Sequence, residues 1–184
     1  GSDNRVCVRL LEKAGIGQTI ATAERMGIKS DLPNVPSIAL GSPSISMIEM
    51  VTAYGVFANN GNYVQPVYIS GIKDQHGNIL QQIESRSKEN RALSEETADM
   101  MIHMLQRVVN EGTGSSIRAR YGLNNDIAGK TGTTQANADG WFIGITPKLV
   151  IGAWVGADDP RLRFRSTAVG QGSATALPIV ARFL

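Results

Sequence analysis

Apolar residues recur at helical spacing in several stretches of the chain. In 95–110 they form one continuous stripe, which predicts an amphipathic helix with Ser94 as its N-cap. A second helix is predicted over 44–59, with Ser42 or Ser44 as its N-cap. Shorter helices are predicted over 5–14, 18–26 and 175–184.

Strand-like composition dominates two other regions. Residues 63–72 and 79–83 flank a polar turn and predict a hairpin. Further strands are predicted over 127–134, 141–146 and 149–155, the last two joined by a short turn. Because these strands follow one another instead of alternating with helices, they predict an α+β fold, an antiparallel sheet flanked by helices.

The composition is that of a folded globular chain, and the length suits one domain or a large piece of a bigger domain. Of the 184 residues, 42% are hydrophobic, and 18 basic against 16 acidic side chains give a net charge of +2. Because phosphate binding needs a concentrated positive field and no basic block is present, nucleic acid is not expected as a partner. The single cysteine, Cys7, excludes an internal disulfide framework and a cysteine-based metal site. His76 and His103 have no second ligand at metal-binding spacing, so no metal or other cofactor is expected.

The N-terminal sequence and one long uncharged stretch bear on targeting. The chain starts Gly-Ser-Asp-Asn-Arg, without Met or an apolar leader, so a mature or excised fragment is expected. Residues 50–72 carry no formal charge, but Asn59, Gln65 and Pro66 among them are incompatible with hydrocarbon. A membrane-spanning segment is therefore not predicted.

Several polar clusters have simple structural interpretations. Asp158 and Asp159 are loop neighbours, which usually point apart, so a turn is favoured over paired catalytic carboxylates. The basic segment 161–165 is interpreted as a solvated loop or edge strand. Residues 112–116 are glycine-rich but lack the lysine of a phosphate-binding loop, and are interpreted as a helix terminus.

The strongest candidate for chemistry is the run of residues 130–133 in the strand predicted over 127–134. Side chains alternate along a strand, so Thr131 and Thr133 share one face and can donate hydroxyl hydrogen bonds to one carboxylate. Lys130 adds a positive charge beside them, and Gly132 leaves room for a ligand backbone. The pattern suits an anionic peptide that adds onto the edge of a sheet.

At this point the chain resembles a known family. Lys-Thr-Gly is a motif of penicillin-binding proteins and serine β-lactamases. Further stretches resemble, in order, the C-terminal part of the transpeptidase domain of class A, bifunctional penicillin-binding proteins. These stretches are GSPSISM at 41–47, AYGVFANNG at 53–61, VVNEGTG at 108–114, IAGKTGTT at 127–134, DGWFIGITP at 139–147, GAWVG at 152–156, GQG at 170–172 and ALP at 176–178. The resemblance implies a penicillin-binding transpeptidase or serine β-lactamase-like fold.

The resemblance also assigns roles to individual residues. The family uses Ser-x-x-Lys, Ser-x-Asn and Lys-Thr-Gly, and Ser2 and Asn4 match the second motif. Ser2 would take part in proton transfer to the leaving group, and Asn4 would hydrogen-bond the substrate amide. Lys130 would hydrogen-bond Ser2. Thr131 and Thr133 would bind the terminal carboxylate of a stem peptide or a penicillin, and the backbone N–H of Thr133 would form half of the oxyanion hole.

The nucleophile motif has no counterpart ahead of Asn4. Literal Ser-x-x-Lys matches occur at 70–73 and 85–88, on a predicted strand and a charged connection. The family's nucleophile instead begins a buried helix, so both are interpreted as chance matches. The acylated serine and its lysine are therefore expected upstream, and residues 1–184 are expected to be the C-terminal portion of a single transpeptidase domain, truncated on its N-terminal side.

The resemblance implies part of a peptidoglycan D,D-transpeptidase that penicillins acylate in the intact protein, and that is inactive as the isolated chain. The implied partners are the stem peptide, β-lactam antibiotics, and an upstream part of the same polypeptide with the rest of the domain, a glycosyltransferase domain and a membrane anchor. The implied location is the extracytoplasmic face of the bacterial cytoplasmic membrane. The alternatives are a non-catalytic peptidoglycan-binding or scaffolding homologue and, with less support, a β-lactamase. A truncated domain is also expected to expose apolar surface or to pair with itself.

Overall fold

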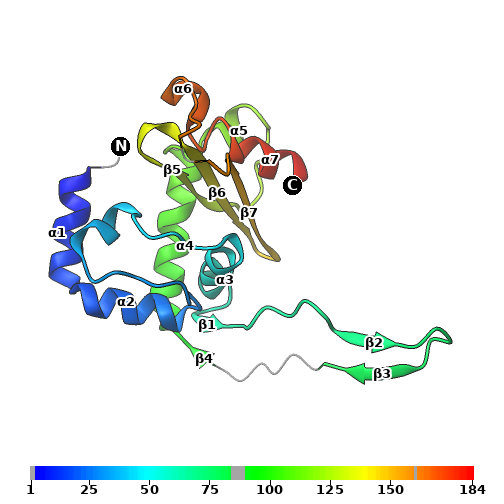
Figure 1. The fold of residues 1–184 in the computed structure, drawn as a ribbon. Coiled ribbons are helices and arrows are strands. Elements are labelled where there is room, and N and C mark those ends of the chain that lie inside the picture. The colour runs from blue at the N-terminus through cyan, green and yellow to red at the C-terminus, as the bar shows by residue number, and fades with distance from the viewer. Residues whose placement is uncertain (1–2, 84–89, 160) are drawn as a thin grey trace.

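The computed structural model describes residues 3–83, 90–159 and 161–184 (Figure 1). Its helices are α1 (Asn4–Ala14), α2 (Ile16–Arg25), η1 (Pro36–Leu40), α3 (Met47–Ala58), α4 (Glu95–Asn110), α5 (Ser116–Ala119), η2 (Gln135–Asn137), α6 (Thr167–Gly170) and α7 (Ala176–Phe183). Its strands are β1 (Asn62–Tyr63), β2 (Gly71–Lys73), β3 (Ile79–Gln82), β4 (Asn90–Arg91), β5 (Ala128–Thr133), β6 (Asp139–Thr146) and β7 (Leu149–Gly156). Antiparallel sheets flanked by helices confirm the predicted α+β class.

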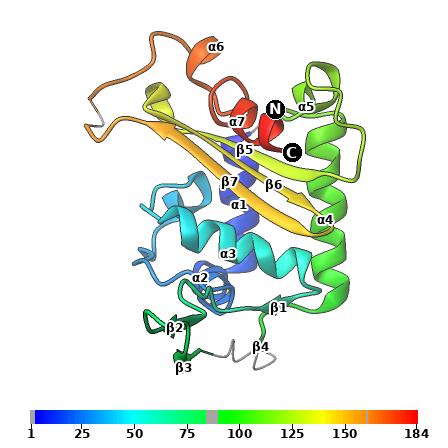
Figure 2. The same cartoon turned by 90° about the vertical axis from the view of Figure 1, so that its right-hand side faces the viewer.

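The central sheet has the order β5-β6-β7, with all neighbouring strands antiparallel. Its two faces are covered by different helices, α7 on one side and α3 on the other (Figure 2). On the α7 side, Phe142 is fully buried in a cluster with Leu177 and Val180. On the α3 side, Ile145 is buried in a cluster with Val56. The long helix α4 packs along β5, so the strand that carries the Lys-Thr-Gly motif is held by a helix at its flank.

Helix α3 begins later than predicted. Its N-cap is Ser46, with an extended backbone, and neither Ser42 nor Ser44 caps it, so that part of the prediction is wrong. The reason is a capping box: the Ser46 side chain accepts from the backbone N–H of Glu49, while the Glu49 carboxylate accepts from the backbone N–H of Ser46. This reciprocal pair satisfies helix-terminal donors that an earlier start would leave without such a partner.

Glu49 also ties α3 to the preceding loop. Its carboxylate accepts hydrogen bonds from the backbone N–H groups of Lys29 and Ser30, at 2.7 and 2.8 Å, and from the hydroxyls of Ser30 and Ser46, at 2.7 and 2.6 Å. These bonds, first those from the Ser46 and Ser30 hydroxyls and then that from Lys29, lower the pKa of Glu49 from 4.5 to about 2. The ionised carboxylate is therefore the form that holds the loop.

Replacing Glu49 by glutamine is expected to lower the free energy of unfolding by about 1–2 kcal/mol, because an amide nitrogen cannot accept from these donors. The effect depends on pH. A lowered folded-state pKa contributes stability above the unfolded value of 4.5, and this stability is lost as the pH falls towards about 2. Urea unfolding of the wild type should show this loss, and the E49Q variant should lack it. Glu95→Gln, at an exposed site in the first turn of α4, is the control and should change stability by less than about 0.5 kcal/mol.

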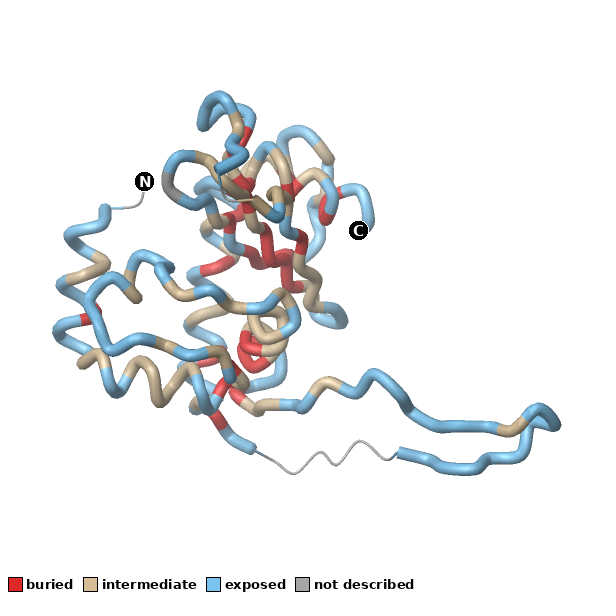
Figure 3. Tube along the Cα trace, in the orientation of Figure 1, coloured by how far each residue is buried: buried red, intermediate tan, exposed pale blue. Residues whose placement is uncertain are grey.

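The predicted hairpin is present, but it projects from the body of the molecule (Figure 1). Of the strand predicted over 63–72, only its two ends are strand. Residues 64–69 have no backbone hydrogen-bond partner among the described residues, and Pro66 has no N–H to donate to one. The arm formed by β2 and β3 is solvent-exposed along nearly its whole length (Figure 3). Tyr68 and Leu80 are 77% and 66% exposed, which is unusual for large apolar side chains.

Exposed apolar side chains also occur on two helices. Val6 and Leu10 lie one turn apart on α1, and Met100 and Met104 lie one turn apart on α4, and all four are more than half exposed. Within the described residues no helix has both the length and the apolar character needed to cross a membrane. Exposed apolar side chains thus occur on α1, α4 and the arm.

Candidate functional site

The Lys-Thr-Gly motif lies on β5, an edge strand of the central sheet within the described residues. Thr131 pairs with Phe142 and Thr133 pairs with Gly140, so both threonines belong to the α7 face. Lys130 pairs with Ile143, and its side chain therefore starts on the α3 face. A ligand that lay along this edge would have the lysine on one side of the strand and the threonines on the other.

The Lys130 side chain is folded back against its own strand. Its Nζ donates a hydrogen bond of 2.6 Å to the backbone oxygen of Thr131, although the residue as a whole is exposed. Partial burial of the ammonium group lowers the pKa of Lys130 below its usual value, and an electrostatic interaction with Cys7 acts in the opposite direction. The ammonium is thus held at the strand edge and lies close enough to α1 to interact with Cys7.

Helix α1 carries Asn4, the residue of the predicted second motif that the structure describes. Asp3 is its N-cap and accepts from the backbone N–H of Arg5 at 2.9 Å, which makes Asn4 the first helical residue. Asn4 and Cys7 are three residues apart and share one face of the helix. The electrostatic effect of Cys7 on the pKa of Lys130 indicates that this part of α1 lies in the neighbourhood of β5. In Figures 1 and 2 the N-terminal end of α1 stands at about the level of β5. Ser2 lies outside the described residues.

The hydroxyls of the two motif threonines are already engaged. Thr131, which is 9% exposed, has its Oγ1 at 2.6 Å from the Oγ1 of Thr113, in the turn after α4. Thr133 is exposed, and its Oγ1 accepts a 3.1 Å hydrogen bond from the backbone N–H of Gly172. A hydroxyl that accepts a bond keeps its own proton, so Thr133 can still donate to a ligand.

Two of the residues that shape this strand were not predicted to do so. Thr113 belongs to the glycine-rich segment that was interpreted only as a helix terminus, and Gly172 belongs to the GQG stretch. Gly172 lies over the strand, where a Cβ atom would meet the backbone oxygens of Gly132 and Trp141. The sequence contains only a weak signal for either role. Thr113 lies between two glycines, and Gly172 belongs to a Gly-Gln-Gly run, and both stretches resemble the family.

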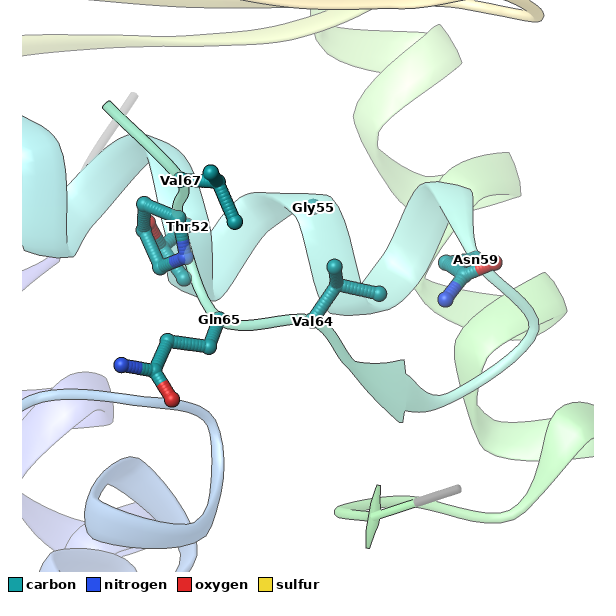
Figure 4. A pocket seen from close by; sticks show the side chains of 7 residues that line it. Thr52, Gly55, Asn59, Val64, Gln65 and Val67 are labelled. Carbon is teal, nitrogen blue, oxygen red and sulfur yellow. The ribbon is translucent and has the colours of Figure 1, made fainter. Parts of the chain in front are cut away.

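Other candidate positions fall elsewhere. The chance match at 70–73 lies on the exposed arm and does not begin a helix, while 85–88 lies outside the described residues. Within the described part of the chain, no three His, Cys, Asp or Glu side chains are grouped so that they could hold a metal ion. An open pocket of about 460 Å³ lies between α3 and residues 64–67, and no candidate site residue lines it (Figure 4). Of the predicted site residues, Lys130, Thr131 and Thr133 lie together on β5.

Comparison with protein families decides the relationship. Residues 8–174 match the model of the penicillin binding protein transpeptidase domain. The chain belongs to this family. Most of the chain lies within the match, including α1 from its fifth residue and the whole of β5.

Individual relatives agree with this assignment. Penicillin-binding protein 1A of Neisseria lactamica is 35% identical over 97% of the chain, and penicillin-binding protein 2D of Bacillus subtilis is 38% identical over 85%. The crystal structure of penicillin-binding protein 1A from Haemophilus influenzae superimposes with a TM-score of 0.85 at 25% identity, and the match covers 98% of this chain and 32% of that one. The class A assignment and the predicted transpeptidase fold are thereby confirmed. The chain spans about a quarter of the length of the curated relatives it matches, 22–25% in the first of them.

Proposed function

We propose that this chain supplies the substrate-binding edge of a serine D,D-transpeptidase that cross-links peptidoglycan. The observation that supports the proposal is the arrangement at β5, an edge strand of the central sheet among the described residues, which carries Lys130 and the Thr133 hydroxyl in the neighbourhood of α1. An extended peptide with a terminal carboxylate fits such an edge by strand addition.

The reaction proposed for the intact enzyme is acyl transfer. A serine oxygen attacks the carbonyl carbon between the last two D-Ala residues of a stem peptide, the C–N bond breaks, and D-Ala leaves as the amine. An amine of a neighbouring strand then takes the acyl group from the serine. Ser2 would take part in proton transfer to the leaving nitrogen, and Lys130 would hydrogen-bond Ser2. Asn4 would hold the substrate amide, and the Thr133 N–H would form half of the oxyanion hole. The hydroxyls of Thr131 and Thr133 would bind the terminal carboxylate. Penicillins would acylate the same serine.

The nucleophilic serine and its lysine are proposed to come from an upstream part of the same polypeptide. Two findings support this: the matched relatives are about four times as long as the chain, and the literal Ser-x-x-Lys of the described residues lies on the exposed arm. That upstream part would also cover apolar side chains such as Leu10 and Met104. A glycosyltransferase domain, a membrane anchor and a place on the extracytoplasmic face belong to the same proposal.

Labelling with a fluorescent penicillin tests the proposal on two samples, the 184-residue chain and the full-length protein. We expect stoichiometric covalent labelling of the full-length protein and none of the isolated chain. Labelling of the isolated chain would show that the nucleophile lies within it. Absence of labelling in the full-length protein would favour a non-catalytic peptidoglycan-binding homologue, and rapid turnover of a chromogenic cephalosporin would favour a β-lactamase.

A further inference from the structure

Helix α3 has an outer face without charge. One side of the helix is buried in the core, and Glu49 in the first turn is its only charged residue. Thr52, Gly55 and Asn59 follow one another at helical spacing on a different side, which we call the outer face. A helix that lacks a charged face is normally covered on all sides by other parts of a protein. The outer face of α3 is therefore of the kind that a folded protein covers.

The open pocket of about 460 Å³ lies against this outer face (Figure 4). A Cβ atom at Gly55 would meet nothing within 4 Å, so the space beside the helix is open there. Val64 and Val67 line the pocket from the other side and are 45% and 46% exposed. No charged residue lines it. The pocket is thus suited to apolar side chains and has room for more than one.

The chain that forms the second wall of the pocket has unpaired backbone groups. Residues 64–69 have no backbone hydrogen-bond partner among the described residues. Before them β1 pairs only with β4, and after them β2 pairs only with β3, in two-stranded sheets. A two-stranded sheet is marginally stable by itself, and unpaired N–H and C=O groups are a template for a further strand. A strand added at 64–69 would extend both small sheets and border the pocket.

The surface beyond the pocket is apolar as well. From residue 64 to residue 83 only Lys73 and Asp74 carry a formal charge. Large apolar side chains that are more than half exposed gather in the same stretch, which projects from the body (Figure 3). They are Tyr68, Ile69, Ile79 and Leu80. Exposed apolar side chains gathered in this way mark an interaction surface.

The near absence of charge favours a partner that stays bound. Permanently closed interfaces are more apolar than transient ones, and charged residues are depleted at their centres. A part of the same polypeptide is the partner that is always present at high effective concentration. The curated relatives are about four times as long as the chain, so they contain such a part.

We propose that a strand from the upstream part of the same polypeptide pairs with residues 64–69 and places apolar side chains in the pocket beside Gly55. The arm formed by β2 and β3 packs against the same upstream part. The inference rests on the proposed function, because it requires the upstream part that the proposed function assigns to the intact enzyme. It gives that part a second place of contact, on the outer face of α3, apart from β5.

Photocrosslinking of the full-length protein tests the contact. A benzophenone side chain introduced at Val67 should form a crosslink within one polypeptide, and mass spectrometry should place its other end upstream of residue 1. A crosslink that joins two copies of the chain, one that reaches only residues 1–184, or the absence of any crosslink would each overturn the inference. The probe is used in the otherwise wild-type protein, so the result does not depend on how a pocket variant folds.

Filling the pocket gives a second, independent measurement. If an upstream strand occupies the space beside Gly55, Gly55→Leu should overpack it and lower the Tm of the full-length protein by about 3 °C or more. Gly17→Leu is the matched control, because Gly17 is also a helical glycine whose Cβ would meet nothing within 4 Å. It should leave the Tm unchanged or raise it, through the higher helix propensity of leucine. A G55L protein as stable as G17L would mean that the pocket stays open.

The two proposals fail in different experiments. A full-length protein that penicillin labels, but whose probe at Val67 reaches no upstream residue, would overturn the inference and leave the proposed function standing. A full-length protein that penicillin does not label would overturn the proposed function, whatever the crosslink shows.

Discussion

Replacing Lys130 by methionine should reduce penicillin acylation of the full-length protein by about 10²–10³-fold, the range found when one general acid–base or charge-stabilising group is removed. Methionine keeps most of the side-chain volume but loses the ammonium that bonds the Thr131 carbonyl oxygen at the strand edge. Stopped-flow or gel-based labelling rates measure the effect. A rate within about threefold of the wild type would mean that Lys130 has no part in the chemistry.

The control for this substitution is Lys148→Met. Lys148 is an exposed lysine in the turn between β6 and β7, remote in sequence from the motif, and its loss should leave the rate unchanged. The pH dependence gives a second check. Because burial lowers the pKa of Lys130, this lysine loses its charge at a lower pH than the usual value of 10.5. Labelling by the wild type should therefore decline with rising pH before an ordinary lysine would titrate, and K130M should lack that decline.

Replacing Gly172 by alanine is expected to be the most destabilising single-methyl change at this site. The added Cβ would overlap the backbone oxygens of Gly132 and Trp141, which are strand backbone and cannot rotate away. We expect a loss of about 3 kcal/mol, or about 6–12 °C in Tm for a domain of this size. The shift would also move the N–H that holds the Thr133 hydroxyl, so acylation should fall with stability. Differential scanning calorimetry measures the first effect.

Replacing a glycine that has open space around it should raise the free energy of unfolding instead of lowering it. Gly17 lies in α2, and a Cβ atom there would meet nothing within 4 Å. Gly17→Ala should therefore raise the free energy of unfolding by about 0.5–1 kcal/mol, through the higher helix propensity of alanine. If G172A were as stable as G17A, the GQG loop could not be packed against β5 as the structure has it.

Local sequence patterns were sufficient to predict the helices and strands that bury one face. The stripe over 95–110 and the cap at Ser94 correspond to α4 residue for residue, because an amphipathic helix and its cap are both properties of neighbouring positions. The predicted strands around 141–155 are β6 and β7 for the same reason. Where a segment has no buried face, as over 64–70, a strand-like composition did not produce a strand. Composition alone does not supply a pairing partner.

The N-cap of α3 shows a narrower limit. Ser42, Ser44 and Ser46 are all acceptable caps by residue type, and the sequence was interpreted in favour of the first two. The reciprocal bonds between Ser46 and Glu49 decide the start, together with the anchoring of Glu49 by Lys29 and Ser30, about twenty residues earlier. The second contribution is tertiary and leaves no local pattern.

At the site, the sequence by itself determined the chemical groups and their order along one strand. The period of two places Thr131 and Thr133 on one face and Lys130 on the other, whatever surrounds them. Only the tertiary structure decided which groups contact the two threonine hydroxyls. Thr113 approaches Thr131 across 18 positions, and Gly172 approaches Thr133 across 39. Such contacts depend on where helix ends and loops are packed against the sheet. The partners of these hydroxyls therefore could not be determined before the fold was known.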